Sequence, residues 1–143
     1  MPTRANHQLV YGAGRLESSV NVSLVNPNVF VPSGKEGLTW AQVPAGPDVE
    51  SRFGIVGNAP EGAAAKVRIA LYGESGPLGD LTRELPAGGS VLASTQADDA
   101  IGEVSRRAGR HLWIMARADR PDLSFFSATR HVKSGHMTGE HGF

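Results

Sequence analysis

The C-terminal tail carries the residues of this chain that are best suited to chemistry. His131, His136 and His141 recur at five-residue intervals, and Glu140 stands beside the last of them. Imidazole and carboxylate groups are ligands for zinc, copper and iron. The spacing is unfavourable for a preformed site, because five residues place successive histidines on opposite faces of a strand and about 140° apart on a helix. Two interpretations stay open: a metal-dependent enzyme whose tail loops around the ion, or a terminal strand and turn with polar side chains that meet solvent or a neighbouring subunit.

Other catalytic patterns are weak. The chain has no cysteine, which excludes disulfides, thiolate metal sites and cysteine nucleophiles. No G-x-S-x-G elbow is present, so a serine hydrolase of that type has no sequence support. The carboxylate pair Asp98 and Asp99 is better explained as the cap of a short helix than as an acid–base pair. The sequence favours a protein that is not an enzyme, with no catalytic residue and no cofactor.

Trp40 is the aromatic residue with the clearest binding potential. Sugar-binding sandwiches often expose an aromatic platform beside polar groups, and Trp40 is flanked by Thr39 and Gln42. Tryptophan is nevertheless highly buried on average, so we expect Trp40 in the core. The other expected core aromatics are Phe53, Tyr72, Trp113, Phe125 and Phe126.

The central stretch from Phe53 to Thr95 predicts consecutive β-strands. In the segment 66–72, polar and apolar residues alternate, which places Val67, Ile69 and Leu71 on one face of a strand. We expect these three residues in the core, together with Leu112, Ile114 and either Phe125 or Phe126. Glycine- and proline-containing turns recur at about the 8–12-residue spacing typical of sandwiches and barrels.

The remaining segments also indicate strands, with one exception. Residues 96–107 predict the single helix, in which Ile101, Val104 and Ala108 share a face and Gly109 serves as the C′ residue. Outside the central stretch, strands are predicted over residues 8–11, 17–26, 29–31, 38–43, 111–118 and 123–130.

These elements predict an all-β fold. Strands do not alternate with helices, which excludes a doubly wound α/β protein. We predict an antiparallel β-sandwich, immunoglobulin-like or jelly-roll, with one short helix. At 143 residues, the chain is expected to form one domain over 1–143, with an N-terminal arm over 1–7 and a C-terminal tail over 131–143.

The charge balance and the apolar content of the sequence argue against two classes of partner, nucleic acids and membranes. Fourteen basic and fourteen acidic residues cancel, so the charge excess typical of nucleic-acid binders is missing. The sequence has no signal-peptide run at its start and no stretch near the ~20 apolar residues of a membrane helix. We therefore expect no nucleic-acid or membrane partner and a cytoplasmic location, with export as part of a larger assembly left open.

The central unit resembles bacterial immunoglobulin-like sandwich modules. The resemblance rests on an Asn-containing turn, the strand KVRIALY, a glycine turn and a return strand that ends at LPAGGS. Among such modules, it is similar to the sensory rhodopsin transducer family of small β-sandwich proteins, over roughly residues 53–95 and, more loosely, over the pair of strands after the predicted helix. The resemblance implies association into tetramers and a non-enzymatic binding or transducing role, and it supplies no catalytic residue.

We therefore expect an accessory or assembly module that forms a homo-oligomer and binds a protein partner. The alternative is a module that binds a small ligand or a glycan. Glycine-rich chain ends are normally mobile unless they are tied down. We expect the tail to dock on a neighbouring subunit or a partner, with Met137 and Phe143 as apolar anchors and His141 as a polar contact.

Overall fold

The computed structural model describes residues 4–13, 16–25, 36–57, 64–97, 99–120 and 122–142. Within these residues there are ten strands and one helix: β1 (Arg4–Ala13), β2 (Leu16–Val25), β3 (Gly37–Pro44), β4 (Val49–Gly57), β5 (Ala65–Gly73), β6 (Gly76–Leu85), β7 (Ser90–Ser94), α1 (Asp99–Ser105), β8 (His111–Ala118), β9 (Leu123–His131) and β10 (Met137–His141).

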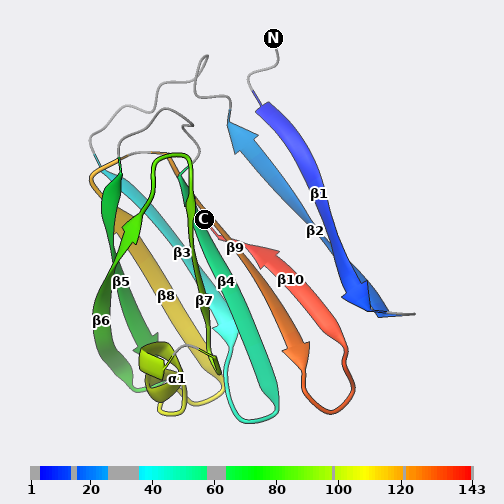
Figure 1. Ribbon diagram of the computed structural model, residues 1–143. Helices are drawn as coiled ribbons and strands as arrows, with labels where there is room; N and C mark the ends of the chain where they lie inside the picture. The colour runs from blue at the N-terminus through cyan, green and yellow to red at the C-terminus, as the bar shows by residue number, and fades with distance from the viewer. Residues whose placement is uncertain are drawn as a thin grey trace.

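Two four-stranded antiparallel sheets form the sandwich (Figure 1). One has the strand order β3-β8-β5-β6 and the other has the order β10-β9-β4-β7. The hairpin β1–β2 forms a separate two-stranded ladder that lies beside β10. The predicted all-β antiparallel sandwich with one short helix is confirmed.

The core forms where the alternating faces of the two sheets meet. Val67, Ile69 and Leu71 of β5 are buried, whereas Lys66 and Arg68 between them are exposed. From the opposite sheet, the rings of Phe53 and Phe125 stack with centroids 5.5 Å apart. The predicted core positions Leu112, Ile114 and Phe125 are also buried, which confirms the register expected from the alternation.

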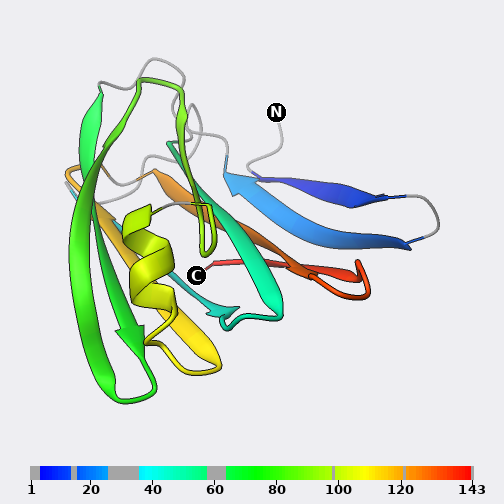
Figure 2. The same cartoon turned by 60° about the horizontal axis from the view of Figure 1, so that its bottom comes forward.

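The helix is shorter than the sequence indicates. It covers the end of the sandwich between the two sheets, where Ile101 and Ala108 are buried (Figure 2). Beyond Ser105 the chain continues in tighter turns, with the Ala108 N–H bonded to the Ser105 carbonyl at 3.1 Å. Gly109 has the positive φ expected of a cap, +84°, but it lies too far beyond the helix end to be its C′ residue. This correction follows from the early tightening of the last turn.

The N-terminal end of the chain differs from the expectation, whereas the C-terminal end matches the strand-and-turn interpretation. Residues 4–7 belong to β1 and pair with β2, so the predicted arm over 1–7 is a strand from Arg4 onward. The tail also forms a strand, since β10 pairs with β9 from Met137 to His141. The predicted strand over 29–31 lies outside the described residues.

The tail docks within its own domain. The Gly142 N–H donates to the Phe125 carbonyl at 2.9 Å. A Cβ on Gly142 would lie 2.5 Å from the Phe125 Cβ and 2.8 Å from the Trp40 carbonyl oxygen, so the backbone here fits tightly between β9 and β3. Residues 137–142 thus contact their own domain, and docking of the tail on a neighbouring subunit or a partner stays a prediction.

Candidate functional site

The outer face of the sheet β3-β8-β5-β6 carries large apolar side chains. Leu38 is 51% exposed, Trp40 is 45% exposed and Met115 is 37% exposed. Trp113 and Tyr72 are half-buried on the same face. We call this set, completed by Gln42, the aromatic face: Leu38, Trp40, Gln42, Tyr72, Trp113 and Met115.

Strand register places these residues in adjacent rows. Trp40 of β3 lies opposite Met115 of β8, which lies opposite the small residue Ala70 of β5. Directly opposed residues of antiparallel strands share a face and lie within side-chain contact. The aromatic face is therefore continuous across the three strands.

The second row is more polar. Gln42 of β3 lies opposite Trp113, which lies opposite Tyr72. The Trp113 ring also meets the His111 ring, with centroids 6.0 Å apart and planes tilted by 57°. This row combines flat rings with hydrogen-bonding groups, a pairing that suits a ligand with both apolar and polar parts.

Charged residues border the aromatic face. Arg117 lies between Leu38 and Arg68 in the register, and its side chain is exposed. Arg68 Nε is 2.7 Å from Asp80 Oδ2, and both side chains are largely in solvent. A polar border around an apolar centre is the general anatomy of a protein interface.

The exposure of Trp40 corrects the expectation that it lies in the core. In β3 the buried positions are Thr39, Ala41 and Val43, so the alternating face that contains Trp40 points outward. Both alternating sets of this strand are partly apolar, and periodicity alone could not choose between them. The signal available in the sequence was Gln42, a polar residue that shares a face with Trp40.

Trp113, Tyr72 and Phe126 need a related correction. They are half-buried on the outer faces of the two sheets and are not core residues. In all three strands, the inward positions are filled by smaller aliphatic side chains or by Phe125. Of the residues in the aromatic face, the sequence therefore indicated only Trp40 as a candidate for binding.

Two of the tail histidines lie at one turn in the described part of the structure. His131 and His136 flank the turn between β9 and β10, where the His131 N–H donates to the His136 carbonyl at 2.8 Å. Glu140 is exposed on β10, and the side chain of His141 lies outside the described set. Among the described residues, no group of three or more His, Cys, Asp or Glu side chains could hold a metal ion. The strand-and-turn interpretation of the tail agrees with this hairpin.

The predicted apolar anchors of the tail lie apart from the aromatic face. Met137 is half-buried and pairs with Arg130 on the sheet β10-β9-β4-β7. Phe143 lies outside the described residues, so its predicted role as an anchor stays a prediction.

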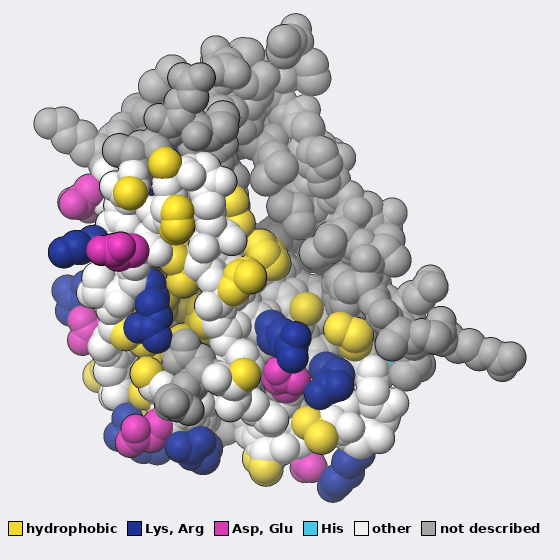
Figure 3. All heavy atoms as spheres, viewed as in Figure 1, with side chains coloured by type: hydrophobic (Ala, Val, Ile, Leu, Met, Phe, Trp, Pro, Cys, Tyr) yellow, Lys and Arg dark blue, Asp and Glu magenta, His cyan; other side chains and the backbone are white. Residues whose placement is uncertain are grey.

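A buried carboxylate organises the outer face of that second sheet. Glu50 Oε1 accepts from Arg52 Nε at 2.8 Å, and Glu50 Oε2 accepts from Arg130 at 3.1 Å. Ser94 Oγ donates to the same carboxylate at 3.3 Å. Basic and acidic side chains lie side by side over β4 and β9 in Figure 3. This cluster joins three strands that are far apart in the sequence.

The arginines change the acidity of Glu50. The hydrogen bond from Arg52, with the charges of Arg52 and Arg130, holds the pKa of the Glu50 carboxyl below its ordinary value, against the opposing effect of burial. Because both oxygens of the buried Glu50 carboxylate accept hydrogen bonds within the sheet, this cluster serves as a structural link between strands and not as an open ligand site.

The lowered pKa predicts a loss of stability in acid. The contribution of the ionised Glu50 to the free energy of unfolding is fully present above the unfolded-state pKa of this carboxyl. It is lost as the pH falls through the folded-state pKa. Both arginines are more than half exposed, so we expect Glu50→Gln to cost only about 1–2 kcal/mol at neutral pH and to reduce the acid-induced loss. Urea unfolding at neutral and acidic pH measures both effects.

The matched control is Glu84→Gln, since Glu84 is an exposed glutamate on β6. This variant should keep nearly the parent's stability at neutral pH. An equal loss in the two variants, or a Glu50→Gln protein as stable as the parent at neutral pH, would contradict the assigned role of the cluster.

Comparisons of the chain with protein-family models, with curated proteins and with solved structures find no match. In the part of the chain that the structure describes, no helix is long and apolar enough to span a membrane. What the protein binds is therefore inferred from the exposed faces and pockets of the sandwich itself.

Proposed function

We propose that this protein is a non-enzymatic binding module that self-associates and binds a protein partner through the aromatic face. The observation that carries the proposal is the exposure of Leu38, Trp40 and Met115 on one sheet face in adjacent register positions. Single exposed apolar residues are normal on protein surfaces, but contiguous ones indicate an interaction site.

The residue types support a protein partner. Trp, Tyr, Met and Arg are enriched at protein interfaces, and the aromatic face with its border contains all four. Tryptophan is also among the residues that contribute most to binding energy. A formal net charge of zero leaves little overall repulsion between two copies of the chain.

Self-association should depend on Trp40. We expect the parent protein to form a homo-oligomer at tens of micromolar, and Trp40→Ala to raise the dissociation constant by about 30-fold, the effect of losing a ~2 kcal/mol hot spot. Sedimentation velocity over a concentration series measures the change. Because Trp40 is already partly in solvent, the variant should remain folded, which circular dichroism checks.

Leu92→Ala is the matched control, because Leu92 is 69% exposed but lies on the opposite sheet. It should leave the dissociation constant unchanged. A parent protein that stays monomeric throughout the series, or a Leu92→Ala effect as large as that of Trp40→Ala, would contradict self-association through the aromatic face.

Glycan binding is the second candidate. The row of Gln42, Trp113 and Tyr72 favours it, because flat rings beside a hydrogen-bonding amide suit a sugar with an apolar and a polar side. A tryptophan-fluorescence titration with neutral oligosaccharides distinguishes the two functions. A saturable change that is lost in a folded Trp113→Ala variant, with a monomeric parent, would favour the glycan over the protein partner.

A further inference from the structure

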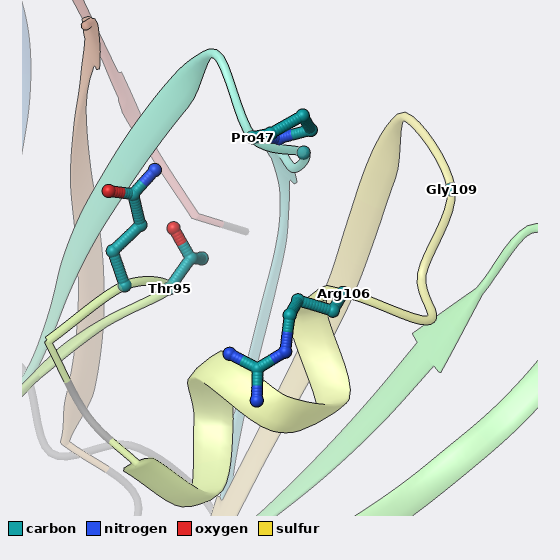
Figure 4. A pocket seen from close by; sticks show the side chains of 6 residues that line it. Pro47, Thr95, Arg106 and Gly109 are labelled. Carbon is teal, nitrogen blue, oxygen red and sulfur yellow. The ribbon is translucent and has the colours of Figure 1, made fainter.

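A pocket lies at the end of the sandwich, away from the aromatic face. It has a volume of about 580 Å³ and is lined by Gly46, Pro47, Thr95, Gln96, Arg106 and Gly109. Figure 4 shows Pro47 on one side of the space, Thr95 beside it and Arg106 projecting from the end of α1. This volume is in the range of about 300–1,000 Å³ that small-molecule sites occupy.

Backbone hydrogen bonds hold the walls of this pocket in place. The Ala45 N–H donates to the Arg110 carbonyl at 2.8 Å, which joins the β3–β4 turn to the segment after α1. The Thr95 N–H donates to the Ser51 carbonyl at 2.9 Å, and the Ser51 N–H donates to Thr95 Oγ1 at 2.9 Å. Three segments far apart in the sequence are thus tied to one another, so the pocket is preformed.

Arg106 is the ionisable side chain of the pocket. Within the described residues, its guanidinium takes part in no ion pair or side-chain hydrogen bond. Two acids beside the lining are engaged elsewhere, since Asp48 pairs with Lys133 at 3.1 Å and Glu74 accepts from the Arg110 N–H at 3.1 Å. A planar guanidinium of this kind is suited to bind a carboxylate through two parallel hydrogen bonds.

Neutral polar groups complete the lining. Gln96 donates through Nε2 to the Val49 carbonyl at 2.8 Å, which fixes the amide and leaves its oxygen as an acceptor. Thr95 Oγ1 accepts from Ser51, so its own hydroxyl hydrogen remains a donor. Pro47 adds an apolar ring. A ligand for this pocket should therefore combine one negative charge, several hydroxyl groups and an apolar ring face.

We propose that this pocket binds a small polyhydroxylated carboxylate of the sugar-acid class. The carboxylate pairs with Arg106, hydroxyl groups meet Gln96 and Thr95, and the ring packs on Pro47. A monoanion is favoured over a phosphate dianion, because the lining offers one cation and lies at the carbonyl end of α1, where the helix dipole is negative. The site is separate from the aromatic face and does not depend on the function proposed for it.

An NMR titration of the full chain tests the site. With glucuronate as the probe, the amide signals of Gly46, Gln96 and Gly109 should shift and saturate. Glucose, which lacks the charge, should cause no saturable shift, and benzoate and inorganic phosphate should bind more weakly than glucuronate. Arg106→Gln should weaken glucuronate binding by about tenfold or more, and Arg106→Lys by less, because lysine keeps the charge but loses the planar fork.

Arg110→Gln is the matched control, since Arg110 is an exposed arginine next to the pocket but is not part of its lining. It should bind glucuronate like the parent, and the dispersed spectra of all three variants establish that they are folded. The proposal is overturned if glucuronate gives no saturable shift up to tens of millimolar or if glucose or phosphate binds as well. The proposal also fails if benzoate binds as tightly as glucuronate, or if Arg110→Gln loses as much affinity for glucuronate as Arg106→Gln.

Discussion

Replacing Arg120 by alanine should lower the free energy of unfolding by about 3–5 kcal/mol, the cost of removing one member of a buried ion pair. Arg120 binds Asp122 through Nε and Nη2, both at 2.6 Å, and the two side chains are only 8% and 12% exposed. This pair lies in the segment where the chain passes from β8 of one sheet to β9 of the other. Without the guanidinium, the Asp122 carboxylate would remain buried beside an unfilled volume.

The surroundings of Arg120 explain why it cannot be replaced easily. A Cβ on Gly57 would lie 2.8–3.0 Å from its guanidinium, and a Cβ on Gly37 would lie 2.2 Å from its carbonyl oxygen. Glycines at the ends of β3 and β4 thus make room for one arginine between the sheets. The hydrogen bonds that Arg120 donates to Asp122 raise the pKa of Arg120 above its ordinary value, despite the opposing effect of burial, so the group stays charged.

Arg68→Ala is the control, because Arg68 forms the same kind of pair with Asp80 on the surface, where the side chains are 69% and 50% exposed. Exposed pairs contribute at most about 1 kcal/mol. Chemical denaturation of both variants measures the difference. Similar losses in the two variants would show that burial does not determine the contribution of the Arg120–Asp122 pair.

Replacing Leu71 by alanine should cost about 2–5 kcal/mol. Leu71 of β5 is 1% exposed, and it lies opposite the buried Ile114 of β8. Removal of its side chain leaves a cavity between the sheets that close-packed neighbours fill only in part.

Leu92→Ala makes the same chemical change at a position that is 69% exposed, so it isolates the effect of burial. We expect a change within about 0.5 kcal/mol for this variant. Guanidinium unfolding monitored by tryptophan fluorescence gives both values. If Leu71→Ala were as stable as Leu92→Ala, the inward face of β5 would be wrongly assigned.

The fold class and much of the core could be predicted from local patterns of residues. In β5 the apolar residues Val67, Ile69 and Leu71 alternate with charged or small ones, so only one face could be buried. Turn residues between the strands set the approximate element boundaries. These signals are local, and local periodicity is sufficient where one face of a strand is clearly more polar than the other.

The direction in which the ambiguous strands face depends on their pairing with other strands. In β3 both alternating sets contain apolar residues, and pairing with β8 placed Thr39, Ala41 and Val43 inward and Trp40 outward. Strand pairing likewise placed Trp113 of β8 on the outer face of the sheet. The aromatic face could therefore not be assembled from the sequence, because its members come from three strands whose order in the sheet is not encoded in any one segment.

Long-range contacts decided the remaining sites for the same reason. Glu50 meets Arg130 across 80 positions of sequence, and the pocket of Arg106 is formed by three segments from the β3–β4 turn to the end of α1. The tail histidines were conspicuous in the sequence, yet the pairing of β10 with β9 spread His131 and Glu140 along a hairpin. Spacing along the chain reports distance in space only within one helix or strand, whereas binding sites in a sandwich are formed between strands.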